Sequence, residues 1–224
     1  MQNNSEKVKL ADVINNFIQR NRKIIISVVI IMAIMFTGTI VFLSVRDSVN
    51  KKAISEIEEL SRNYESLKFI VNEEEYFDDI NTLLADLHTF ANKTSGYAGA
   101  KAWSIIAHIQ AARKLWQQAE EAFVNAARVG SKTYLAPISL FNAAAAAEEQ
   151  GKLEQAIELL QQSLEQRFEF PAAPRAQFSI GRLNEELGNF QAAIESYRAV
   201  QINWPEMPTW QQLARSRITA IEIR

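Results

Sequence analysis

The fold is decided by three aligned stretches of sequence: Lys114–Ala119 (KLWQQA), Gly151–Ala156 (GKLEQA) and Gly188–Ala193 (GNFQAA). Each stretch follows the previous one at an offset of 37 residues. Four residues beyond the last alanine of each stretch stands a large side chain, namely Phe123, Leu160 and Tyr197. Agreement at this many positions predicts that one supersecondary unit recurs three times along the chain.

The same register extends upstream of each stretch. A large residue, two variable positions and a pair that ends in a small residue recur in Trp103-x₂-Ile106-Ala107 and Leu140-x₂-Ala143-Ala144. The third copy, Gln177-x₂-Ile180-Gly181, begins with glutamine instead of an apolar residue. Alanine, glutamate, glutamine and leucine dominate these segments, and no Asn-Gly or Asp-Gly hairpin turn occurs. The repeating unit is therefore expected to be a pair of helices that approach closely at the small residues.

This pattern resembles the tetratricopeptide repeat, in which a large residue, a small pair and an Ala-x₃-aromatic motif recur in order. The resemblance implies a tetratricopeptide-repeat α-solenoid, and with an apolar run near the N-terminus the expected fold is all-α: a single N-terminal transmembrane helix followed by this solenoid. We assign residues 100–209 to three repeats of 37-residue period and residues 210–224 to a capping helix. Residues 46–99, apolar at helical spacing, are expected to form a stalk helix and a degenerate first repeat.

Residues 24–45 read IIISVVIIMAIMFTGTIVFLSV and contain no charge. As a helix with a rise of ~1.5 Å per residue this run spans about 33 Å, enough for a hydrocarbon core of ~30 Å. A cleaved signal peptide is one alternative, but the run is long and its exit offers no small-x-small cleavage site. A buried helix of a soluble domain is another. We interpret residues 24–45 as an uncleaved transmembrane signal anchor.

Residues 1–23 carry five basic residues, three of which, Arg20, Arg22 and Lys23, directly precede the span. The positive-inside rule therefore favours a cytoplasmic N-terminus. Within this segment an apolar stripe recurs at helical spacing in Leu10, Val13, Ile14, Phe17 and Ile18. It predicts an amphipathic helix on the membrane surface, with docking onto a partner as the alternative.

With this orientation we expect a single-pass protein of the bacterial inner membrane, with its repeat domain in the periplasm. The chain contains no cysteine, which suits an oxidising compartment.

Composition argues against several classes of function. The formal net charge of −2 does not favour a nucleic-acid-binding surface. The chain has no cysteine and only two histidines, His88 and His108, so few residues could bind a transition metal or act as a histidine base. The acidic cluster around Glu73–Glu75 lacks the spacing of a calcium-binding loop. No nucleotide or hydrolase motif occurs. We expect no enzyme activity, no catalytic or metal-binding residue, no cofactor and no small-molecule substrate, with an unrecognised membrane-bound hydrolase as the remote alternative.

The expected activity is binding of other proteins. In tetratricopeptide arrays the first helix of each pair lines a groove, and the resemblance places four candidate partner-binding residues there: His108, Phe141, Phe178 and Arg182. Phe141 and Phe178 occupy equivalent positions and would offer an exposed aromatic pair to a partner. The alternative is that the stalk or the capping helix covers them as ordinary core. Some tetratricopeptide arrays bind the C-terminal carboxylate of a partner through a set of polar and basic residues, and this sequence does not have those residues at the matching positions.

The layout of the whole chain resembles the YfgM family of ancillary subunits of the Sec translocon. The local likeness lies in Phe17 to Lys23 entering the span and in Ser95–Ala100 entering the first repeat. This resemblance implies a non-catalytic accessory factor of protein export, with the translocon or a membrane-anchored chaperone as partner. The alternative is a structural scaffold of another envelope assembly, such as a motility apparatus or the cell-wall machinery.

Topology is the first testable consequence. Alkaline phosphatase fused after Arg224 should be active, and a reporter that works only in the cytoplasm should be inactive at the same site, because the charges favour a cytoplasmic N-terminus. The opposite pattern of the two reporters would reverse the orientation and remove the basis for a periplasmic role.

Overall fold

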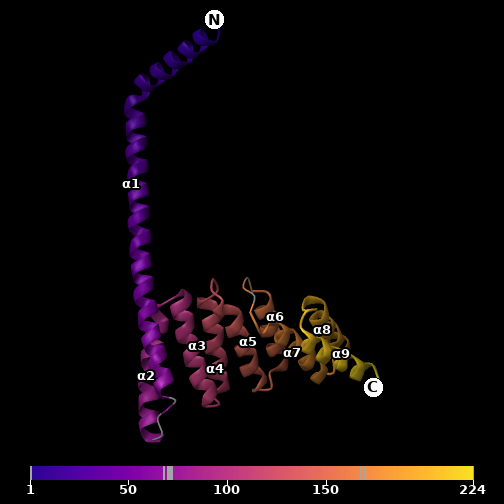
Figure 1. Cartoon of the computed structure of the whole chain (residues 1–224). Helices are drawn as coiled ribbons and strands as arrows, with labels where there is room; N and C mark the ends of the chain where they lie inside the picture. The colour runs from indigo at the N-terminus through magenta and orange to yellow at the C-terminus, as the bar shows by residue number, and fades with distance from the viewer. Residues whose placement is uncertain (1, 68, 70–72, 167, 169, 224) are drawn as a thin grey trace. The chain divides into compact units, whose positions relative to one another are not determined.

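The computed structural model describes the backbone of residues 2–67, 69, 73–166, 168 and 170–223. Side chains are described for the same residues except 2–14, 18, 25, 29 and 73–75. The described residues form nine α-helices and no strand (Figure 1). Their bounds are α1 Gln2–Leu67, α2 Glu73–Lys93, α3 Gly96–Ala112, α4 Trp116–Val129, α5 Leu135–Glu148, α6 Leu153–Leu164, α7 Ala173–Glu186, α8 Phe190–Asn203 and α9 Pro208–Glu222.

The chain divides into two compact units, Met1–Lys52 and Ala53–Arg224, and α1 runs through the boundary. Among the described residues, Gln19–Leu67 is a helix long and apolar enough to cross a membrane by length and composition, with a mean hydropathy of 2.8 in its most apolar window. None of that window is buried against the rest of the protein.

Hydroxyl groups within the apolar run bond back to the helix itself. Ser27 Oγ donates to the Lys23 carbonyl at 2.9 Å, and Thr37 Oγ1 donates to the Ala33 carbonyl at 2.8 Å. Thr39 Oγ1 does the same with the Met35 carbonyl. These polar groups therefore need no outside partner in an apolar environment. In the N-terminal stripe Phe17 is exposed, while Leu10, Val13, Ile14 and Ile18 lie outside the described side chains.

The second unit is an all-helical solenoid of antiparallel pairs. The first, second and third pairs are α3 with α4, α5 with α6 and α7 with α8; helix α2 packs on α3 at one end, and the single helix α9 packs on α8 at the other. Figure 1 shows that the connections preceding α3, α5, α7 and α9 all lie along one edge of this unit. The short turns within the pairs lie along the opposite edge. We refer to the connections on the first edge as the inter-repeat connections.

Small residues allow the two helices of each pair to approach closely. Ala107, Ala144 and Ala156 are buried, as the repeat pattern requires. At Gly181 on α7, a methyl group would lie 2.6 Å from Cε1 of Tyr197 on α8. Tyr197 is itself completely buried, so its ring cannot move into solvent to make room. The third pair is therefore packed so tightly that its first helix must carry glycine here.

The turn inside each pair uses a left-handed residue at the same repeat position. Gly151 has φ +73° and Gly188 has φ +78°. In the first pair this position is Lys114, with φ +59°. Its backbone bonding matches that of the glycines, since Lys114 N–H donates to the Ala111 carbonyl and Leu115 N–H to the Gln110 carbonyl. The backbone thus keeps one turn geometry in all three repeats, and the first repeat holds it with a residue that has a Cβ.

Exchanging that residue tests the shared turn. Lys114→Gly should raise the free energy of unfolding by roughly 0.5–1 kcal/mol, because a Cβ in the left-handed region costs ~1–2 kcal/mol and glycine gives part of this back as chain entropy. Urea denaturation of the full-length protein in detergent measures the change. Lys132→Gly, at an exposed position without positive φ, is the matched control and should not stabilise. Equal effects of the two substitutions would contradict the prediction.

Candidate protein-binding surface

Equivalent positions on the first helices of the three repeats define a candidate surface. His108 on α3, Ala145 on α5 and Arg182 on α7 are spaced by 37 residues, and His108 and Ala145 are exposed. We call these three residues, together with exposed Arg175 at the start of α7, the first-helix face. His108 is only partly available, because its ring packs edge-on against Phe123 of α4, with the ring centres 5.0 Å apart.

The two candidate phenylalanines do not form one exposed aromatic pair. Phe141 is half-buried against Phe170 in the connection before α7, with ring centres 6.0 Å apart, and the Arg175 guanidinium lies 5.6 Å from the centre of its ring. Phe178 is half-buried between Tyr197 and Trp210 of α9, at 5.0 and 5.6 Å. Trp210 of the C-terminal helix thus covers part of the Phe178 ring.

Arg182 connects successive first helices. Its Nη2 donates to Glu148 Oε2 of α5 at 2.6 Å, and its Nη1 lies 3.6 Å from Glu186 Oε2 on its own helix. Both Arg182 and Glu148 are close to 40% exposed. The guanidinium therefore lies at the surface, where it is available to a partner's carboxylate only in competition with two resident ones.

A second carboxylate at the equivalent position has a different environment. Glu185 lies 37 residues after Glu148, but its side chain is buried. It accepts hydrogen bonds from Arg217 of α9, through Nε at 3.1 Å and through Nη2, and from the Tyr197 hydroxyl at 3.2 Å. Burial, followed by the nearby Glu185 carboxylate, raises the pKa of Tyr197. This cluster fixes α9 onto the third repeat.

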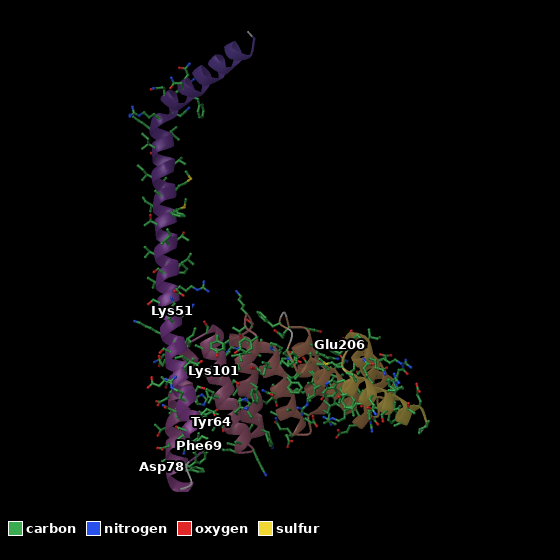
Figure 2. The ribbon with its side chains drawn as sticks, in the orientation of Figure 1. Lys51, Tyr64, Phe69, Asp78, Lys101 and Glu206 are labelled. Carbon is green, nitrogen blue, oxygen red and sulfur yellow. The ribbon has the colours of Figure 1, made fainter. Side chains whose placement is uncertain are left out.

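A third ion pair connects α1 to the solenoid. Lys101 Nζ on α3 lies 2.7 Å from Glu58 Oε1 on α1, and Figure 2 labels Lys101 beside that helix. The hydrogen bond from Lys101 lowers the pKa of Glu58. Burial, followed by the neighbouring Tyr134, raises the pKa of Tyr97 to about 12, and the Tyr97 hydroxyl also reaches Glu58. The lowered pKa of Glu58 favours the charged carboxylate, which is the form that accepts the hydrogen bond from Lys101.

Sequence reasoning missed these inter-helix ion pairs. The signal available was the glutamate repeated at 148 and 185. The arginines that meet these glutamates, Arg182 and Arg217, do not follow the same register, so the pairs could not be read from spacing alone.

The described side chains contain no group of three or more potential metal ligands. His88 packs edge-on against Trp103, with ring centres 5.6 Å apart. The acidic side chains of Glu73–Glu75 lie outside the described residues.

Comparison with known proteins identifies the repeats. The tetratricopeptide repeat family matches residues 106–167 and 141–208. The chain is 39% identical over 145 residues to a "TPR repeat-containing protein" of Treponema pallidum (strain Nichols). That match covers 64% of this chain and 60% of the relative, so the alignment spans less than two thirds of the relative's length. Residues 106–208 are thus tetratricopeptide repeats, which build scaffolds for protein–protein interaction.

Solved structures with similar helical arrays include the TPR-like repeats of a putative kinesin light chain from Podosopora anserina. That structure has 16% sequence identity and a TM-score of 0.49, and the match covers 74% of this chain and 96% of that one. A variant of the same repeats gives 16% identity and a TM-score of 0.45, with 71% and 90% covered. With both scores below 0.5, the repeat assignment rests on the family match.

The buried Glu185 cluster makes a stability prediction. Arg217→Met should lower the free energy of unfolding by about 2 kcal/mol, because it leaves a buried carboxylate without its cationic partner. Arg198→Met is the matched control, since Arg198 pairs with Glu222 between helices α8 and α9 in a contact that is more than half exposed on both sides. That loss should be at most about 1 kcal/mol. Chemical denaturation of the two variants distinguishes them, and equal losses would contradict the buried role of Glu185.

Proposed function

We propose that this protein is a non-catalytic, membrane-tethered scaffold that binds other proteins through its repeat domain. Tetratricopeptide repeats over residues 106–208 support the binding role. The unburied apolar helix within Gln19–Leu67 supports the tether, because an apolar surface of that length is unfavourable in water unless something covers it. The single observation that carries the proposal is the presence of both features in one chain.

A tether changes what the repeat domain must do. Confining the domain near a membrane complex raises its effective concentration there, so each contact with a partner can be weak. The first-helix face fits weak binding, because its cations are already engaged by resident carboxylates or an aromatic ring.

The finer proposal concerns location and partner. We place the anchor in a bacterial inner membrane with the repeats on the periplasmic side, following the charge distribution around residues 24–45. There the protein would act as an accessory factor of protein export, bringing the translocon and a membrane-anchored folding factor together. Support for this role is the layout that the chain shares with the YfgM family.

The test is purification of the tagged full-length protein from its native membranes in mild detergent, with partners identified by mass spectrometry. Translocon subunits or a membrane-anchored chaperone are the expected partners. A motility or cell-wall complex recovered without them would make the protein a scaffold of that assembly instead. Extraction of the protein by alkaline carbonate, without detergent, would contradict the tether.

A pair of variants links binding to the first-helix face. Ala145→Arg adds a long charged side chain at an exposed position of α5 and should release the partner without unfolding the repeat, since arginine is a good helix former. Gln161→Arg makes the same change of charge at an exposed position of α6, the second helix of that repeat, and should retain the partner. Retention by both variants would show that the partner binds elsewhere.

A further inference from the structure

A cavity of about 750 Å³ lies between two neighbouring inter-repeat connections, the one before α7 and the one before α9. Its volume falls within the range of about 300–1,000 Å³ that is usual for ligand sites. Among the described residues, those that line it include Phe168, Gln177, Asn203, Trp204, Glu206 and Met207. The cavity belongs to the edge of the solenoid and uses none of the residues of the first-helix face.

The cavity occurs where the third repeat departs from the pattern of the other two. Gln177 occupies the position of Trp103 in the first repeat and Leu140 in the second, so a polar residue replaces a large apolar one. Leu140 is buried, whereas Gln177 is half-buried and lines the cavity. The connection that precedes α7 is also longer than the one that precedes α5, as the helix bounds show. Ordinary repeat packing is therefore replaced by open space at this place.

The lining has the chemistry of a peptide site. Aromatic, proline and methionine side chains provide apolar contact area; among them Phe168, Trp204 and Met207 are half-buried, whereas Phe170 is only 6% exposed. The side-chain amides of Gln177 and Asn203 make no hydrogen bond to another described residue, and each offers both donors and an acceptor. Donor and acceptor together are what the backbone of an extended peptide presents.

The charge of the lining selects among peptides. Glu206 is the only charged side chain among the described lining residues, and it is exposed on the connection between α8 and α9, where Figure 2 labels it. A carboxylate at the mouth of an apolar site favours a cationic partner and disfavours an anionic one.

We propose that this cavity binds an extended segment of a partner protein in which apolar residues alternate with lysine or arginine. The apolar side chains of the segment pack against Trp204 and Met207, and the amides of Gln177 and Asn203 pair with its peptide groups. The Glu206 carboxylate pairs with a lysine or arginine of the segment. This site uses neither the membrane tether nor the first-helix face, so a test of peptide binding here does not test the scaffold function, and the reverse also holds.

The first test uses charge reversal. The probe is a short fluorescein-labelled peptide in which leucine and proline alternate with lysine, and its counterpart carries glutamate in place of lysine. Fluorescence anisotropy with the full-length protein in a non-ionic detergent measures binding, with empty micelles as the blank. The protein should bind the lysine peptide and discriminate against the glutamate peptide. Glu206→Lys should weaken the lysine peptide about tenfold, equivalent to ~1.4 kcal/mol, and strengthen the glutamate peptide.

Glu149→Lys is the matched control for that variant. Glu149 is exposed at the end of α5, on the opposite edge of the solenoid, and its replacement changes the net charge by the same amount. Its affinity for both peptides should equal that of the unmodified protein. An equal loss in Glu149→Lys would show diffuse electrostatic attraction and overturn the proposal, as would failure of the unmodified protein to bind the lysine peptide.

The second test removes the side-chain amide of Gln177, which the proposal pairs with a peptide group. Gln177→Leu restores the residue type of the second repeat, so it should keep or raise the melting temperature while weakening the lysine peptide at least tenfold. Thermal unfolding and anisotropy on the same preparation give both readings. A stable Gln177→Leu protein that binds the lysine peptide as before would overturn the proposal, because the Gln177 amide would then make no hydrogen bond to the peptide.

Discussion

The contact between Gly181 and Tyr197 shows the constraint on which the repeat array depends. Two helices can bury a shared apolar face only if their backbones come close, and a side chain at the crossing point prevents this. Alanine at 107 and 144 and glycine at 181 keep that point open. The larger Tyr197 of the third pair requires the smaller residue, since even one methyl group would overlap its ring. Residue size at one repeat position thus sets the spacing of each pair.

Stacking such pairs creates a problem at the end of the array. A terminal pair exposes an apolar face, which a further element must cover. Here α9 covers the last pair, with Trp210 against Phe178 and Arg217 bonded to buried Glu185. The polar contact adds orientation to the apolar one, because a guanidinium meets a carboxylate and a hydroxyl in a defined geometry. The same helix that completes the core therefore covers part of the Phe178 ring.

Prediction from sequence was most accurate where the local structure depends on the size of a single residue. The helix pairs and the close approach at Gly181 follow from residue size at fixed register. The candidate surface was less predictable. Phe141 and Phe178 occupy equivalent positions, yet one meets Phe170 and the other meets Trp210. Both neighbours come from segments outside the repeat register, so spacing within the repeats carried no information about them.

The sequence by itself determined the all-helical repeat architecture and the long apolar helix near the N-terminus, because both depend on periodicity and composition along the chain. Only the tertiary structure decided which side chains remain open, which carboxylate is buried and where a cavity lies. These properties depend on how irregular segments, such as the connection before α7 and helix α9, lie across regular ones. Their positions are fixed by contacts between residues distant in sequence, and such contacts have no repeat to reveal them.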